Sequence, residues 1–184
     1  MSSITISGDT SGSVILQAPA VSGSTTLTLP ATSGTVLTTT SPKSGNVLQV
    51  VSANSDTQTT TTSTSYVTAN LSASITPSSA SSKILILVNT VIQVGSGGDM
   101  QATIFRGTVS GTNLASGATS QGLFYSTATA GSSTGYTGAT MSFLDSPSTT
   151  SSTTYTVGFK TSGITAVIQK GQTYATITLM EIAG

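Results

Sequence analysis

The sequence contains no cysteine and no histidine. A chain without these residues cannot build a disulfide, a Ser-His-Asp or Cys-His catalytic arrangement, or a thiolate or imidazole metal site. Its five acidic residues lie far apart in the chain, so the sequence does not indicate the paired carboxylates of a glycoside hydrolase. We therefore expect a protein that is not an enzyme and that holds no cofactor and no metal ion.

Charge is also scarce. Charged residues make up 5% of the chain, and five basic side chains balance five acidic ones. Such a surface offers no basic face for nucleic acid or for an anionic membrane. No apolar run approaches the roughly 18 residues of a membrane span, and the first residues lack the features of a signal peptide. We expect neither nucleic-acid binding nor membrane insertion, and a chain working outside the cell would need another exit, such as lysis.

Serine and threonine are abundant, and part of this abundance is periodic. The pair Ser-Gly stands at 11–12, 22–23, 33–34 and 44–45, which is a period of eleven residues. Each unit has this turn, a short apolar extended run and usually a proline. One unit buries too little to be stable alone, so we predict that three chains wrap into an intertwined β-stalk over residues 11–45. The alternative is a few ordinary strands at the start of a sandwich.

From residue 46 onward the pattern changes to strands separated by loops rich in Gly, Ser and Thr, with no helical period. Nine strands are predicted, over 46–52, 56–77, 83–94, 100–106, 121–127, 139–145, 153–160, 163–170 and 173–182. This count predicts an all-β fold in which an antiparallel jelly-roll β-sandwich forms a head domain over residues 46–184.

Two of these strands, 83–94 and 173–182, are apolar on both faces. In a two-layer sandwich the outer face of a strand meets water, so a second apolar face needs cover. A loop could supply it, but a second subunit fits better because the stalk independently requires three chains. The candidates for this trimer interface are Tyr174, Met180 and Ile182.

Other residues give weaker signals. Tyr125 and Tyr136 lie among small polar residues and could stack on sugars of a receptor, although packing is the commoner role of such rings. The glycines of residues 95–98 indicate a hairpin turn and not a phosphate-binding loop, because no helix follows them. Four basic residues are interpreted as single charges that keep strand ends and edges soluble: Lys83, Arg106, Lys160 and Lys170.

The start of the chain, ISGDTSGSVILQAPAVSGSTTLTLPATSGTVLTT, resembles a segment that recurs in structural proteins of tailed phages, especially from marine and aquatic viruses. The remainder resembles the C-terminal module often joined to it, chiefly in the motifs TPSSASSKILI and SFLDSP followed by TYTV. The resemblance implies a virion fibre, spike or decoration protein with a trimeric, tumour-necrosis-factor-like jelly roll on a slender stalk. It implies no catalytic residue.

Together these patterns predict a homotrimeric projection on the capsid or tail surface of a virion, with an adhesive role toward a host-surface glycan or protein. One alternative is a capsid decoration protein that stabilises the shell. Another is a depolymerase tailspike, which the few carboxylates and the short stalk disfavour.

Residues 1–10 precede the predicted stalk and contain SITIS, a short alternating strand with Ile4 and Ile6 on one face. Short strands of this type bind by adding to an exposed sheet edge of another protein. We therefore predict that residues 1–10 attach the protein to another virion structural protein.

Overall fold

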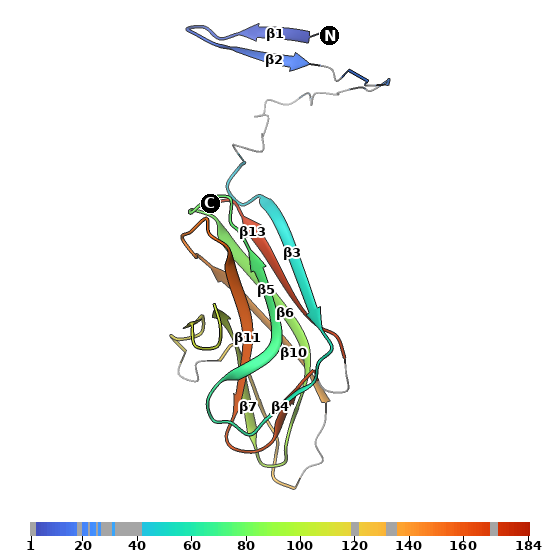
Figure 1. The fold of residues 1–184 in the computed structure, drawn as a ribbon, viewed down its shortest axis with the longest axis vertical. Coiled ribbons are helices and arrows are strands. Elements are labelled where there is room, and N and C mark those ends of the chain that lie inside the picture. The colour runs from blue at the N-terminus through green and yellow to red at the C-terminus, as the bar shows by residue number, and fades with distance from the viewer. Residues whose placement is uncertain are drawn as a thin grey trace. The chain divides into compact units, whose positions relative to one another are not determined.

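A computed structural model describes residues 3–17, 20–21, 23–24, 26, 31, 42–118, 122–131, 136–169 and 173–184. Within these ranges all regular structure is β-strand, and no helix is present (Figure 1). The chain divides into two compact units, Met1–Val36 and Leu37–Gly184, which we describe in turn.

The N-terminal unit contains a two-stranded antiparallel hairpin of β1 (Ser3–Ser7) and β2 (Ser13–Gln17). Its turn is closed by a hydrogen bond of 3.0 Å from the N–H of Gly8 to the carbonyl of Gly12. Gly12 has φ +80°, a left-handed conformation that glycine adopts without steric cost. The hairpin spans residue 10, where the sequence pattern separated an attachment segment from the stalk.

Most of the predicted stalk lies outside the described residues. Of residues 11–45, the structure describes 11–17, a few isolated positions and 42–45. Leu27, Leu29 and Gly34, which belong to the second and third repeat units, are among the residues not described. The intertwined β-stalk therefore stays a prediction.

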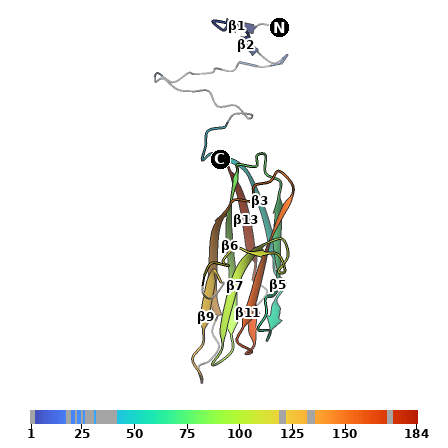
Figure 2. The ribbon, with the colours of Figure 1, turned by 90° about the vertical axis from the view of Figure 1, so that its left-hand side faces the viewer.

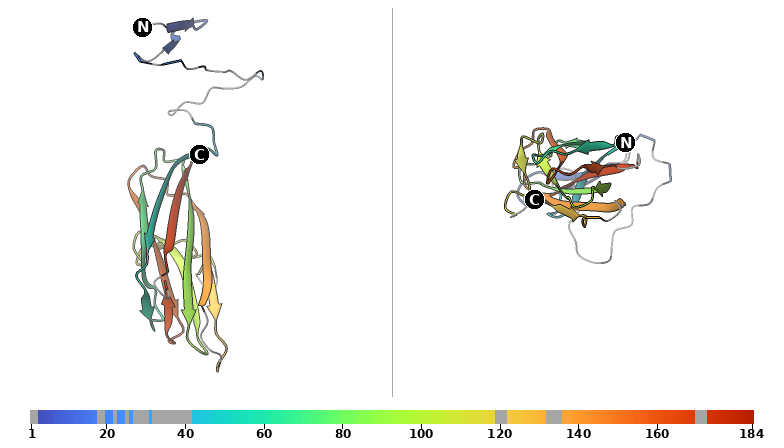
Figure 3. Two further views of the ribbon diagram at one scale, coloured as in Figure 1. Left: turned by 90° about the vertical axis from the view of Figure 1, so that its right-hand side faces the viewer. Right: turned by 90° about the horizontal axis from the view of Figure 1, so that it is seen from below.

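The second unit, the head, contains two antiparallel sheets. The first sheet, seen face-on in Figure 3 (left), has the long strands β3 (Val47–Ser55), β13 (Ala175–Ile182), β6 (Lys83–Val94) and β10 (Tyr136–Asp145), in that order. Two short strands, β12 (Ala166–Ile168) and β4 (Thr59–Thr61), continue this sheet from β6. The second sheet, in front in Figure 2, contains β5 (Val67–Ile75), β11 (Thr153–Thr161), β7 (Asp99–Arg106), β8 (Thr112–Asn113) and β9 (Phe124–Thr127).

The long strands pair in a nested order. The first pairs with the last, β3 with β13, and the following pairs are β5 with β11, β6 with β10 and β7 with β9. Two further ladders, β13 with β6 and β11 with β7, join these pairs into the two sheets. All of these ladders are antiparallel, which confirms the antiparallel all-β fold predicted from the sequence.

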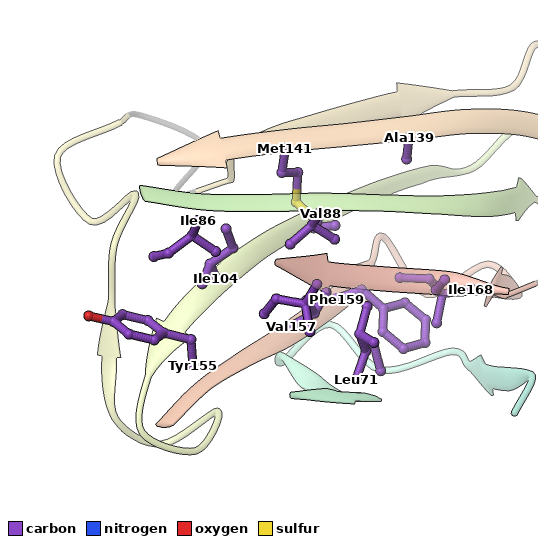
Figure 4. Packing of buried hydrophobic residues seen from close by; sticks show 14 of the residues in the cluster. Leu71, Ile86, Val88, Ile104, Ala139, Met141, Tyr155, Val157, Phe159 and Ile168 are labelled. Atoms are coloured by element: carbon purple, nitrogen blue, oxygen red, sulfur yellow. The ribbon is translucent and has the colours of Figure 1, made fainter. Parts of the chain in front are cut away.

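The core lies between the two sheets. Alternate residues of β6 point inward, so that Ile86 and Val88 are fully buried. They face Ile104 and Val157 of the second sheet, with Phe159 nearby (Figure 4). In β13, Ala175, Ile177 and Leu179 likewise have no solvent exposure, so the face opposite Met180 and Ile182 lies in the core.

Some strands differ from their predicted bounds. Of the strand expected over 163–170, only β12 is formed within the described residues. It is preceded by Gly163, which has a left-handed backbone conformation with φ +102°. The glycines of residues 95–98 do form a turn, closed by the N–H of Gly98 on the carbonyl of Gly95 at 3.0 Å. However, this turn connects β6 to β7, which lie in different sheets, so the prediction of a hairpin at this position was wrong.

Candidate functional site

A row of four apolar side chains crosses the outer face of the first sheet. The ladders place Val50 opposite Met180, Met180 opposite Leu85, and Leu85 opposite Leu144. Directly opposed residues in neighbouring strands project from the same face of a sheet. Val50 is 55% exposed and Leu144 is 50% exposed, and the two central residues are half-buried. We call these four residues the apolar row.

The apolar character continues on one side of this row and ends on the other. Toward the start of β3, Val47 is 54% exposed and is paired with Ile182, and Ile182 is paired on its other side with the exposed Lys83, where the apolar character ends. In the other direction the next rank contains Ser52, Thr178, Leu87 and Ser142, and the rank after it is entirely polar. A contiguous apolar patch that is bordered by polar residues is typical of a protein–protein contact.

The structure brings two of the three predicted interface residues onto this patch. Met180 belongs to the apolar row and Ile182 lies beside it. Tyr174 is 71% exposed and precedes β13. At about 3.3 Å per residue, it lies roughly 20 Å along the chain from Met180. The patch therefore includes Met180 and Ile182 without Tyr174.

Three residues of the patch, Val47, Val50 and Leu144, were not singled out from the sequence. Val50 and Leu144 stand in short segments, NVLQVVS and SFLD, that read as ordinary strands. Their outward direction follows from alternation, but their place beside Met180 and Leu85 follows from ladders between distant parts of the chain. The signal in the sequence that could have identified them is an apolar residue at a position where alternation predicts a polar, outward-facing side chain.

A buried carboxylate supports the side of the patch formed by β3 and β13 from beneath. The side chain of Glu181 accepts hydrogen bonds from Gln49 Nε2 at 2.6 Å and from the N–H and Oγ of Ser78, both at 2.7 Å. Burial by itself raises the pKa of Glu181, but these hydrogen bonds outweigh it and hold the pKa below its ordinary value. Glu181 therefore joins β3 and the loop after β5 to the strand that carries Met180 and Ile182.

The other end of the row is held by an ion pair between the two sheets. Asp145, at the end of β10, is 3% exposed and pairs with Arg106 at the end of β7. Arg106 Nε donates to Asp145 Oδ2 at 2.8 Å, and Tyr155 Oη donates to the same oxygen at 2.6 Å. Burial, and then this hydrogen bond, raise the pKa of Tyr155. Leu144 is thus presented by a strand end that is fixed to the opposite sheet.

The basic residues correct one interpretation made from the sequence. Arg106 is not a single surface charge, because its guanidinium is the partner of buried Asp145. Lys160 Nζ lies 4.8 Å from the centroid of the Tyr66 ring, which is within the range of a cation–π contact. Lys83 is exposed at the start of β6, and Lys170 lies outside the described residues.

The two tyrosines considered for receptor contact lie in different sheets. Tyr125 is in β9 of the second sheet, is 53% exposed and donates to Asp99 Oδ2 at 3.3 Å. Tyr136 begins β10 of the first sheet opposite Gln93 and is 65% exposed. Both rings are open to solvent, and each belongs to a strand of a different sheet.

The described residues contain no group of three or more His, Cys, Asp or Glu side chains arranged to hold a metal ion. Across the same ranges, no helix is long and apolar enough to span a membrane.

No family model and no curated protein sequence matches this chain. Among solved structures, it is similar to a chain of the infectious bursal disease virus Gx strain, with a TM-score of 0.41 and 16% identity, over 98% of this chain and 46% of that one. A chain of T=1 particles derived from infectious bursal virus has a TM-score of 0.40 and 15% identity, over 97% of this chain and 44% of that one. The chain therefore spans less than half the length of these proteins. Similarity at this level establishes neither a common fold nor a common function.

Proposed function

We propose that this chain is a structural protein of a tailed-phage virion. In this proposal it is a homotrimer whose jelly-roll head is carried on a short stalk and projects from the capsid or tail surface. The virion assignment rests on the resemblance of the Ser-Gly segment and of the head motifs to phage structural proteins. The observation that carries the assembly is the apolar row of Val50, Met180, Leu85 and Leu144.

The jelly-roll assignment is supported by the nested strand order. A jelly roll has eight strands in two sheets built from two Greek keys. When a long antiparallel hairpin is rolled into two sheets, its first strand pairs with the last and its second strand with the one before the last. The remaining strands pair inward in the same way. The eight strands β3, β5, β6, β7, β9, β10, β11 and β13 follow this order, and β4, β8 and β12 are short additions to it.

The need for further subunits follows from the exposed patch. Completing the burial of Val50, Leu144 and Val47 would stabilise an assembly by about 1 kcal/mol each, since full burial of such side chains contributes roughly 1.5–3 kcal/mol. An isolated head leaves this surface in water.

The strands at the two edges of the first sheet favour a closed ring of copies. Neither β3 nor β10 contains lysine, arginine or proline, the residues that usually protect an open edge. If the edge of one copy covers the apolar row of the next, the contact joins two different surfaces. Contacts of this heterologous kind form a closed ring when the rotation between neighbouring copies closes, and a trimer is the ring that the predicted stalk requires.

The N-terminal segment is assigned to attachment in this proposal. Residues 1–10 hold the projection to another virion structural protein through β1, the strand that contains Ile4 and Ile6. The main chain of β1 supports this role, because in the described residues β1 pairs on one side only, with β2. Addition of a strand to its other edge would give affinity through main-chain hydrogen bonds. Outward-facing residues of the head, with Tyr125 and Tyr136 as candidates, are then free to contact a host surface.

The mass of the protein in solution tests the assembly. Light scattering of the full chain should give about 55 kDa, three times the 18.2 kDa of one chain, at micromolar concentration. An 18 kDa species that melts cooperatively would contradict the proposal.

The position on the particle tests the virion assignment. Antibody labelling or a reconstruction should find the protein as discrete projections, with the head directed outward. A continuous layer of heads lying against the shell would favour the decoration protein instead.

A further inference from the structure

The N-terminal hairpin has one apolar face. The ladder places Ile4 opposite Leu16 and Ile6 opposite Val14, so four apolar side chains form a compact patch of two cross-strand pairs. All four are open to solvent, with exposed fractions of 65% for Ile4, 50% for Leu16, 56% for Ile6 and 62% for Val14.

The opposite face of the hairpin is mostly polar. It contains serine, threonine and glutamine at five of its six positions, and Ile15 is the exception. Neither strand contains a charged residue. The hairpin is therefore an amphipathic two-stranded sheet that distinguishes an apolar side from a polar side.

Such a hairpin needs a partner. A single two-stranded hairpin is at best marginally stable in water, because it has no second layer on which to bury its apolar face. The four exposed side chains are the surface on which that layer would form.

We propose that the apolar faces of three hairpins, one from each chain of the trimer, pack against one another and form a small second core. This inference rests on the homotrimer of the proposed function and adds an interface that the head does not contain. The apolar face of each hairpin is then covered by the apolar faces of the hairpins of the other two chains. The open main-chain edge of β1 then stays available for the virion protein that holds the projection.

One observation and one consequence of the proposed trimer favour copies of this chain over a different partner. The patch has no charge, so it is complementary to itself and contains nothing that selects a charged partner. In addition, heads that assemble through their own surface would bring three hairpins together at a high effective concentration, at which weak apolar contacts become populated.

The chain is well suited to a direct test because it has neither cysteine nor tryptophan, so one introduced reporter is unambiguous. Leu16→Cys places a thiol on the apolar face of the full-length protein, and Ser13→Cys places one on the polar face as a matched control. A disulfide forms only when the two Cβ atoms come within about 4.5 Å of each other. Mild oxidation should therefore link most Leu16→Cys trimers into covalent dimers and leave the Ser13→Cys protein largely unlinked.

A second reporter, an introduced tryptophan, measures the burial of this face without a cross-linking reaction. The fluorescence of Leu16→Trp should be shifted to the blue in the full-length trimer, and adding Ile4→Asp should return it to the wavelength of a solvent-exposed indole. The mass of every variant is measured in parallel by light scattering.

The outcomes separate this inference from the proposed function. A trimer in which Leu16→Cys links no better than Ser13→Cys, or in which the Leu16→Trp variant fluoresces like an exposed indole, overturns the inference and leaves the homotrimer intact. A monomeric protein overturns both. A blue shift that appears only after addition of virus particles assigns the face to another virion protein and also overturns the inference.

Discussion

Ile177 and Met180 lie three residues apart on β13 and point to opposite sides of the first sheet. Ile177 is completely buried in the core, whereas Met180 is half-buried on the outer face, between Val50 and Leu85. The same strand therefore serves the core of one head with one face and the proposed contact between heads with the other.

An aspartate at these two positions should have different effects. Ile177→Asp should prevent folding, because an unpaired carboxylate in the core costs several kcal/mol. Met180→Asp should leave the fold intact and release monomers of 18.2 kDa. Circular dichroism measures the first effect and light scattering the second. Loss of the folded monomer in both variants would mean that Met180 is part of the core.

Stability should decrease in acid through Glu181. Hydrogen bonds from Gln49 and Ser78 hold the pKa of Glu181 below its ordinary value of 4.5, so the ionised carboxylate stabilises the fold above this pH. This contribution is lost as the pH falls through the lower pKa of the folded state, so the melting temperature should decrease as the pH falls below about 4.5.

The matched variant for this prediction is Glu181→Gln, which cannot be protonated. At pH 7 it should be less stable than the original protein by about 1–3 kcal/mol, because the charged acceptor is lost. Its melting temperature should then change less on acidification. An acid-induced decrease of equal size in both proteins would exclude Glu181 as the source.

The ion pair between the sheets should depend more on Arg106 than on Tyr155. Tyr155→Phe removes one hydrogen bond to Asp145 and should cost about 1–2 kcal/mol. Arg106→Leu leaves the carboxylate of Asp145 buried without its counter-ion and should cost about 3–5 kcal/mol. Denaturant unfolding measures both values, and the reverse order would show that the tyrosine is the more important partner.

The head should fold without the stalk. A chain that begins at Ser44 keeps the hydrogen bonds between Gly45 and Ala183 and between Ala183 and Asn46, and it keeps the whole core. It should therefore form a stable trimer. A peptide of residues 1–43 should not fold alone, because its short units cannot offset about 1–2 kcal/mol of backbone entropy per residue. A cooperative thermal transition of that peptide would reverse the dependence.

Attachment should be lost without loss of the trimer when the first strand is changed. Deletion of residues 2–8, or replacement of Ile4 and Ile6 by Asp, removes or disrupts β1 and leaves the head unaltered. The variant should be a soluble trimer by light scattering and should be absent from purified virus particles. Normal incorporation into particles would show that another part of the protein is the anchor.

The sequence predicted which segments form strands and, for most of them, which face points into the core. It could do so because the alternation of apolar and polar residues is a local property. Ile86 and Val88 share a face of the strand at 83–94 whatever lies beside it, and the same holds for Ile177 and Leu179 in the last strand. The lack of helical periodicity likewise indicated an all-β head. From this local pattern the outward direction of Met180 and Ile182 followed as well.

Only the tertiary structure decided which strands are neighbours and in which register. The apolar row exists because Val50, Leu85, Leu144 and Met180 are aligned across four strands from distant parts of the chain. Arg106 reads as a single charge until the ends of β7 and β10 are brought together, and Ile4 reads as part of a lone strand until β2 returns beside it. The direction of a side chain depends on its own strand, whereas its neighbours depend on hydrogen bonds between strands that the whole fold selects.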